Sequence, residues 1–175
     1  SGYTGKMLKA YAFWKQSQDK TTTQVVKAPN AYEHLPRPWI FLAGSIEIGK
    51  AEDWQTFVTN ELKHLPITIL NPRRDDWDSS WEQSIENPQF RQQVEWELAA
   101  QEDADLILCY FAPETKSPIT LLELGLFGSK MIVCVPEGYW RKGNVDIVCR
   151  RYGWRQVPDL AVLVEEAKKK VEAVR

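Results

Sequence analysis

Short apolar runs alternate with amphipathic stretches along most of this chain. The apolar runs, which are candidates for buried strands, lie at 39–44, 67–72, 104–111 and 130–136. Stretches with helical periodicity lie near 50–64, 88–103, 118–129 and 159–174. Runs of this length separated by amphipathic helices are typical of a parallel sheet that is covered on both faces. The pattern therefore predicts a single-domain α/β fold with a doubly wound, mostly parallel sheet, a three-layer sandwich of the flavodoxin or Rossmann type.

Residues 1–24 differ from the rest of the chain. They are polar, rich in Lys, Gln and Thr, and carry no sustained apolar period. We interpret them as an N-terminal appendage and attribute part of it to cloning. A chain of 175 residues that is 43% apolar can bury one sizeable core. We therefore expect residues 25–175 to form one domain.

Composition and charge argue against several classes of function. The formal charge is −2, and the basic residues are scattered, so no basic stripe is available to bind a nucleic-acid polymer. No apolar run reaches the about 18 residues of a membrane span. The three cysteines lack metal-ligand spacing, and Cys109 and Cys134 lie in apolar runs where reduced thiols are usual. These features predict a cytoplasmic protein with no membrane contact, no metal and no cofactor.

Ligands of doubly wound sheets bind beyond the carboxyl ends of the strands. This rule selects four segments, at 43–50, 71–81, 112–123 and 137–144. In the first of them, Gly44 and Ser45 lead into a helix expected to open at about Lys50, so backbone N–H groups could bind a sugar or phosphate oxygen. A tight turn that needs glycine for its backbone freedom explains the same residues equally well.

The segment 113–125 is more informative. Ser117 followed by Pro118 is typical of a helix N-cap and first turn, which places Glu123 on the second turn at the ligand edge. The helix N-terminus favours an ionised carboxylate, and a glycosyl nucleophile must be ionised. Leucines at positions 121, 122, 124 and 126 predict a buried stretch without a basic partner. A charge in such a place is costly unless it is used, although a surface glutamate is the simpler alternative.

A second acid lies on the helix predicted near 88–103. The helical period brings Gln93 and Glu97 onto one face of that helix. Glycosyl transfer needs two acids, because one carboxylate attacks the sugar while a proton donor assists the departing base. Glu97 is a candidate for the second role, but the residues alone leave this question open.

The loop after the second predicted strand combines acids with tryptophan. Asp75, Asp76 and Trp77 follow that strand, and Trp81 lies four residues further on. Two tryptophans so close together favour a stacking surface for a flat base. A solvated surface loop is the alternative.

Three ordered motifs give the chain a specific resemblance to a known family. They read FLAGSIE from Phe41, NPRRDDW from Asn71 and SPITLLELG from Ser117. With these motifs the chain resembles the nucleoside 2-deoxyribosyltransferase superfamily, which includes the 2-deoxynucleoside 5-monophosphate N-hydrolases, over roughly residues 38–150. The resemblance implies the doubly wound fold, nucleosides and free bases as small-molecule substrates, and a homo-oligomer in which a neighbouring chain completes each site.

The resemblance also implies roles for single residues. Glu123 matches the nucleophilic glutamate, and Ser117 falls where the family keeps a polar group that holds the sugar. Glu97 stands where relatives usually have an aspartate that protonates or orients the leaving base. Gly44 and Ser45 match the turn near the sugar 5-position.

Two departures from the monophosphate hydrolases bear on the substrate. Glu47 stands where they tend to have an arginine, and Asn144 stands where they tend to have a serine. A glutamate would repel a phosphate, so both differences favour a free nucleoside. Asn144 instead resembles the asparagine that transferases lend to a neighbour's site. The chain ends in a basic helix rather than the short tail of known transferases, which leaves base recognition to the Asp75–Trp77 loop.

The residues and the resemblance together predict a retaining, two-step base exchange through a deoxyribosyl ester of Glu123. An N-hydrolase with the same nucleophile and water as the acceptor is the nearest alternative. A nicotinamide-dinucleotide glycohydrolase and a non-catalytic nucleotide-sensing domain are alternatives of other classes.

Overall fold

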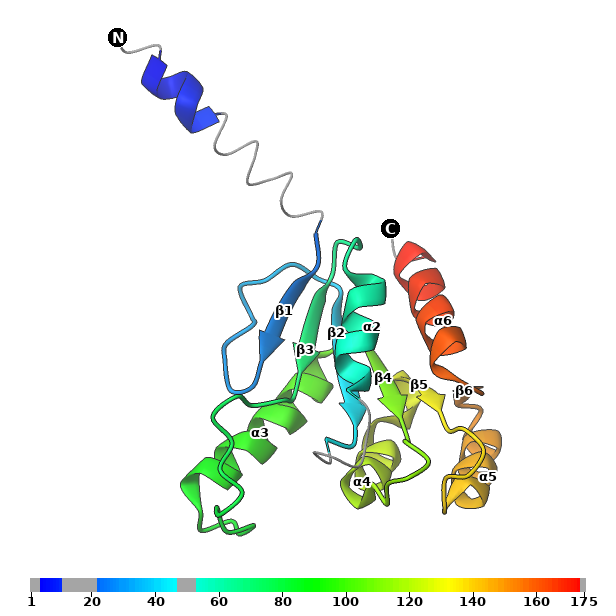
Figure 1. Ribbon diagram of the computed structural model, residues 1–175. Helices are drawn as coiled ribbons and strands as arrows, with labels where there is room; N and C mark the ends of the chain where they lie inside the picture. Colours follow the sequence, from blue (N-terminus) through cyan, green and yellow to red (C-terminus); the bar gives the residue numbers. More distant parts are fainter. Residues whose placement is uncertain (1–3, 11–21, 47–52, 174–175) are drawn as a thin grey trace.

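A six-stranded sheet forms the centre of the computed structural model, which describes residues 4–10, 22–46 and 53–173 (Figure 1). The strands are β1 (Gln24–Lys27), β2 (Trp39–Gly44), β3 (Thr68–Asn71), β4 (Leu106–Tyr110), β5 (Met131–Cys134) and β6 (Arg155–Val157). Their order is β1-β3-β2-β4-β5-β6, and every neighbouring pair is parallel. From β2 onward this is the flavodoxin order, with β1 added at one edge. The predicted doubly wound α/β fold is therefore confirmed.

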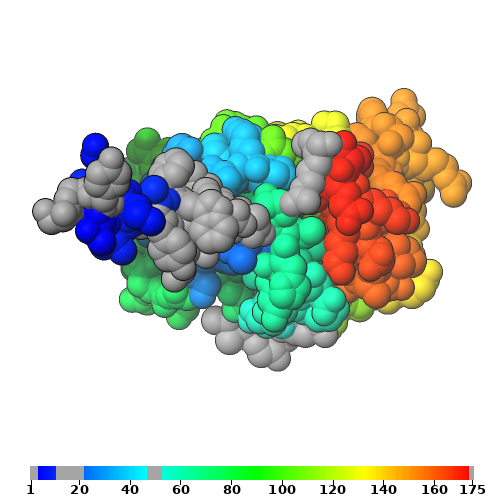
Figure 2. Space-filling model, turned by 90° about the horizontal axis from the view of Figure 1, so that it is seen from above, coloured from blue at the N-terminus to red at the C-terminus, as the bar shows by residue number. Residues whose placement is uncertain are grey.

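Helices cover both faces of the sheet. One face carries α3 (Pro88–Asp103), α4 (Pro118–Phe127) and α5 (Lys142–Tyr152), and the short 3-10 helix η1 (Gly128–Lys130) follows α4. The other face carries α2 (Trp54–Leu62) and α6 (Leu160–Ala173), which lie side by side in Figure 2. A separate short helix over residues 4–10 has only exposed side chains. None of the described helices is long and apolar enough to cross a membrane.

Two apolar cores fill the spaces between the layers. Phe41 and Ile107 point into the core under α3, α4 and α5. Their chain neighbours Leu42 and Leu108 point into the core under α2 and α6. All four side chains are at most 1% exposed. Because successive strand residues face opposite sides and both sides are covered, the central strands form continuous apolar runs in the sequence.

Four features of the fold differ from the sequence-based expectation. The first helix begins at Trp54 rather than at about Lys50, because the carboxylate of Asp53 caps it by accepting from the Thr56 N–H at 3.2 Å. Lys50 itself lies outside the described residues. The apolar pattern also did not predict β1, α5 and β6. The strands β1 and β6 are short edge strands, and α5 buries only Val145 and Cys149.

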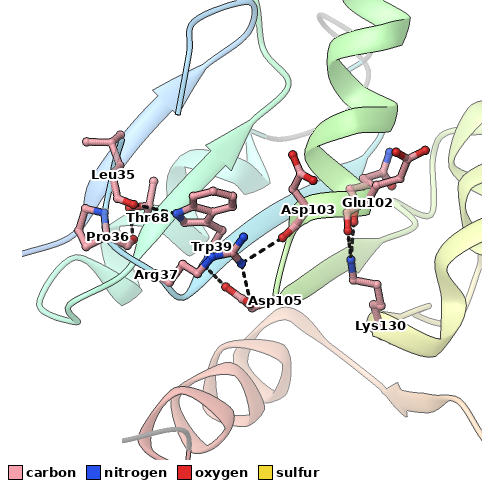
Figure 3. Close-up of polar contacts among 10 residues, drawn as sticks. Leu35, Pro36, Arg37, Trp39, Thr68, Glu102, Asp103, Asp105 and Lys130 are labelled. Atoms are coloured by element: carbon pink, nitrogen blue, oxygen red, sulfur yellow. Dashed lines mark hydrogen bonds and ion pairs between the residues drawn. The ribbon is translucent and has the colours of Figure 1, made fainter. Parts of the chain in front are cut away.

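A polar cluster around Asp105 lies at the amino ends of the strands (Figure 3). The carboxylate of Asp105 accepts from the backbone N–H of Trp39 at 2.7 Å and from the Arg37 guanidinium at 2.8 Å. In the same region Lys130 donates to the carbonyl oxygen of Glu102 at 2.7 Å and so satisfies the carboxyl end of α3. These contacts therefore hold the start of β2 and the end of α3 in place. The candidate site lies at the opposite side, beyond the carboxyl ends of the strands.

Candidate active site

The strand order reverses between β2 and β4, and ligands of this fold class bind at that point. At this point β2 ends at Gly44, and close packing against two neighbouring residues requires a glycine there. A Cβ at position 44 would lie 2.5 Å from Cζ2 of Trp54 and 2.7 Å from the carbonyl oxygen of Tyr110. Only glycine therefore lets β4 and α2 approach this closely. Ser45 follows and is buried.

The helix α4 begins at the carboxyl edge, where Ser117 is its N-cap and Pro118 its first residue, as predicted. Ser117 has a left-handed backbone (φ 47°, ψ 53°), and its hydroxyl makes no capping bond. Its Oγ lies 2.7 Å from Oγ1 of Thr115, which donates to the carbonyl oxygen of Ala112 at 2.9 Å. The Ser117 hydroxyl is therefore held by the preceding loop instead of the helix.

Two aromatic residues that sequence reasoning missed hold the same loop. The hydroxyl of Tyr139 donates to the carbonyl oxygen of Lys116 at 2.6 Å, and Nε1 of Trp140 donates to it at 2.9 Å. Both residues follow β5, so they join two neighbouring strand ends next to Ser117. An aromatic pair directly after a predicted strand was the available signal.

Glu123 lies on the second turn of α4 and is 8% exposed. The prediction that the neighbouring leucines bury Glu123 was wrong in part, because Leu122 and Leu126 are 62% and 57% exposed. Consecutive residues of a helix point in different directions, so apolar neighbours in the sequence do not cover one another. Glu123 instead faces α3, where Nε2 of Gln101 donates to its Oε2. Within the described residues it makes no ion pair.

Three polar side chains form a stripe along α3 at four-residue spacing: Gln93, Glu97 and Gln101. Nε2 of Gln93 donates to Oε1 of Glu97 at 2.9 Å and to the carbonyl oxygen of Pro72 at 2.8 Å. Gln93 and Glu97 therefore share one face, as the helical period predicted. Sequence reasoning missed Gln101, although one more step of the same period leads to it.

Glu97 and Glu123 influence each other's ionisation. Burial raises the pKa of Glu97 from 4.5 to about 7. Burial, and then the like charge of Glu97, raise the pKa of Glu123 to about 8. The expectation that the helix N-terminus keeps Glu123 ionised is thus corrected, because loss of hydration outweighs it. Near neutral pH the two carboxyl groups titrate as a coupled pair.

A pocket opens beside Glu97, and several of the predicted site residues line it. Its lining residues are Ile46, Pro72, Arg73, Arg74, Asp75, Trp77, Gln93 and Glu97. The ring of Trp77 packs edge-on against Trp81, with centroids 5.0 Å apart. Asp75 pairs with Lys27 at 3.0 Å. The pocket therefore combines an aromatic ring with a half-buried acid, Glu97.

Six of the predicted site residues are not among these lining residues: Gly44, Ser45, Asp76, Ser117, Glu123 and Asn144. Asp76 accepts from Nε of Arg74 at 2.7 Å and is not a lining residue. Asn144 lies exposed on the first turn of α5 and makes no side-chain hydrogen bond within the described part of the chain. Glu47 lies outside the described residues. In the described ranges, no group of three or more His, Cys, Asp or Glu side chains could hold a metal ion.

Fold and site together define an α/β protein with a pocket beyond the ends of β2 and β3, lined by the half-buried Glu97, and with a second carboxyl group, the buried Glu123, on the neighbouring helix. The family model described as "Nucleoside 2-deoxyribosyltransferase like" matches residues 37–139, more than half of the 175 residues, and the chain belongs to this family. The resemblance seen in the three motifs is thereby confirmed. No curated protein shows a significant match to the chain. Family membership indicates transfer or hydrolysis at the glycosidic bond of a small nucleoside.

The raised pKa of Glu123 predicts a pH-dependent gain in stability for Glu123→Gln. The folded state prefers the protonated carboxyl, so the wild-type protein loses stability as the pH rises from 4.5 through about 8. Glutamine mimics the protonated form. We expect a gain in the free energy of unfolding of less than about 1 kcal/mol at pH 5 and on the order of 2–4 kcal/mol at pH 8, at about 1.4 kcal/mol per pKa unit.

Urea unfolding at the two pH values measures this effect. Glu172→Gln, at an exposed position of α6, is the matched control and should change neither value. A variant no more stable than wild type at pH 8 would show that the Glu123 carboxylate is adequately solvated.

Proposed function

We propose that this protein is a nucleoside 2-deoxyribosyltransferase that exchanges the base of a 2-deoxynucleoside through a covalent deoxyribosyl ester of Glu123. The proposal depends on one observation: Glu123 of α4 contacts Gln101 of α3, one turn from Glu97, and Glu97 lines a pocket beyond the ends of β2 and β3. Two carboxyl groups in one site are the requirement for glycosyl transfer with retention.

In the first step a carboxylate oxygen of Glu123 attacks C1′ of the sugar. The C1′–O bond of the ester forms as the C1′–N bond breaks, and Glu97 gives its proton to the departing base. In the second step a nitrogen of another base attacks C1′, its proton passes to Glu97, and Glu123 leaves. Two displacements at C1′ retain the configuration.

The pocket supports roles for the other predicted site residues. Trp77 offers a ring on which a base can stack, and Gln93 and Asp75 offer polar atoms for its edge. Ser117 adjoins the start of the helix that carries Glu123, which suits a sugar-binding hydroxyl. Gly44 and Ser45 come from the adjacent strand end and fit the 5-position of the sugar.

The charges around the pocket support a free nucleoside as substrate. Arg73 and Arg74 line the pocket, but each has an acidic partner, Asp53 at 3.4 Å and Asp76 at 2.7 Å. Neither arginine is left as an uncompensated charge for a phosphate. A 5-monophosphate would therefore gain less than at an unpaired guanidinium.

Exposed apolar side chains on α4 support self-association. Ile119, Leu122 and Leu126 are 60%, 62% and 57% exposed and recur with helical spacing on one face of α4. Ile147 of α5 is 70% exposed, and α4 and α5 cover the same face of the sheet. Apolar patches of this kind mark contacts between proteins. A second copy bound here would lie next to the helix that carries Asn144.

We predict that Asn144 acts on the substrate of a neighbouring subunit. Chains with Glu123→Ala and chains with Asn144→Ala should each be inactive alone. Mixing them should restore part of the activity, because some mixed sites receive both intact residues. The mixture is assayed for base exchange, with each variant mixed with itself as the control. A monomer by light scattering at assay concentration, or a mixture as inactive as its parts, would contradict shared sites.

A base-exchange assay tests the proposed function. The protein is incubated with a panel of deoxynucleosides and a different free base, and the products are separated. We expect a new nucleoside only when the second base is present. Base release that is independent of the acceptor would identify an N-hydrolase, and no turnover of any deoxynucleoside would contradict both activities.

A further inference from the structure

The nucleophile has a neighbour that neither the sequence motifs nor the proposed reaction assigns. Gln101 is completely buried, and its side chain lies against Glu123. Its amide Nε2 donates to Oε2 of Glu123 and, at 3.2 Å, to the backbone oxygen of Glu97. The backbone oxygen of Glu97 can only accept, so an inverted amide would place its own oxygen against that oxygen. The orientation of the Gln101 amide is therefore determined by its surroundings.

Gln101 is also held from the backbone side. Its carbonyl oxygen accepts from Nζ of Lys130 at 2.7 Å. The same Nζ donates to the carbonyl oxygen of Glu102 (Figure 3). Because both the backbone and the side chain of Gln101 are held by hydrogen bonds, Gln101 can restrict the more flexible side chain of Glu123. The Glu123 side chain has three rotatable bonds, and one fixed N–H donor at Oε2 removes much of that freedom.

We propose that Gln101 is a positioning residue for the nucleophile, which holds Oε2 of Glu123 and leaves Oε1 to attack C1′ of the sugar. This inference rests on the proposed function. The bond that forms is Oε1–C1′, and the bond that breaks is C1′–N, with the proton moving from Glu97 to the base. Gln101 exchanges no proton or electron pair. It fixes which oxygen reacts and the direction from which it approaches.

Gln101 also favours the carboxylate form of Glu123. Its N–H donor opposes the rise in the pKa of Glu123 that burial and the charge of Glu97 cause. The only other titratable group that the electrostatics of the described residues connect to Glu123 is the thiol of Cys109 on β4. Burial keeps that thiol protonated. Loss of the Gln101 amide should therefore raise the pH at which Glu123 ionises.

Gln101→Met tests the inference, because it removes the amide but keeps a long side chain. We expect kcat to fall about a hundredfold, as for a reacting group displaced by about 1 Å, with KM nearly unchanged. The acid limb of the kcat profile should move to higher pH. Gln101→Asn, whose amide is one methylene too short to reach, should do the same. Gln89→Met, at an exposed position of α3, is the matched control and should leave all three quantities unchanged.

A second measurement separates this inference from the proposed function. The carboxyl carbon of Glu123 can be titrated by carbon NMR without substrate, in the Glu97→Gln background, where it has no acidic neighbour. We expect Gln101→Met to raise the midpoint of that titration. An unchanged midpoint, or wild-type kcat in both Gln101 variants, would overturn the inference even if base exchange is observed. Absence of wild-type turnover would contradict the proposed function and would leave the titration as the test of Gln101.

Discussion

Replacing Glu123 with alanine or glutamine is expected to abolish turnover and leave the fold intact. The carboxylate is the only protein group that forms a bond to C1′ in the proposed reaction, so its loss removes the covalent route. We expect a fall of several orders of magnitude in kcat. The fold should persist because no ion pair of the described residues depends on Glu123, and Gln101 can still donate to a glutamine at position 123.

The control for this prediction is Glu114→Ala, which removes an exposed glutamate from the loop before α4. It should retain wild-type activity. A Glu123 variant that keeps more than about a tenth of wild-type activity loses at most about 1.4 kcal/mol of transition-state stabilisation. That is too little for a covalent nucleophile, and such a result would contradict the assignment.

The second large effect is expected from Glu97→Gln. A glutamine keeps the hydrogen bond with Gln93 but cannot give a proton to the departing base. Loss of a general acid should lower kcat about a hundredfold to ten-thousandfold for ordinary deoxynucleosides. The loss should be much smaller for an N7-methylated purine deoxynucleoside, because its base departs neutral without protonation. Glu102→Gln, exposed on the same helix, is the control.

Glu97→Gln should also change the dependence of kcat on pH. In wild-type protein the productive form carries one proton, on Glu97, while Glu123 is ionised. It is the less populated of the two singly protonated forms, because the pKa of Glu123 is the higher of the two. Activity should fall below about pH 7, where both groups are protonated, and above about pH 8, where both are ionised. In Glu97→Gln the basic limb should disappear, because Glu123 is then the only one of the two groups that still titrates. A loss of kcat that is equal for all bases, with an unchanged profile, would exclude Glu97 as the acid.

The sequence predicted the central sheet because its strands are buried on both faces. Runs such as the one from Trp39 to Gly44 have no polar interruption, so their apolar pattern is unambiguous. The edge strands β1 and β6 bury fewer residues, and their short sequences carry little of that signal. Backbone pairing with β3 and β5 holds these two segments in the sheet.

The site was predictable where its residues share one element or one motif. Gln93 and Glu97 follow from helical spacing, and Glu123 follows from a motif at a helix start. The pairing of Glu97 with Glu123 was implied only by the chemistry, because it joins two helices across the end of the sheet. The ionisation of Glu123 was misjudged for the same reason. A local rule about helix ends cannot include the burial and the like charge that α3 supplies.

The most direct test of the central claim is mass spectrometry of protein quenched during turnover. With a deoxynucleoside and no acceptor base, the account predicts protein that carries one deoxyribosyl group on the peptide containing Glu123. Addition of a second base should remove this group and yield the new nucleoside. Turnover by a protein that never carries the group, or a group attached to any residue other than Glu123, would contradict the account.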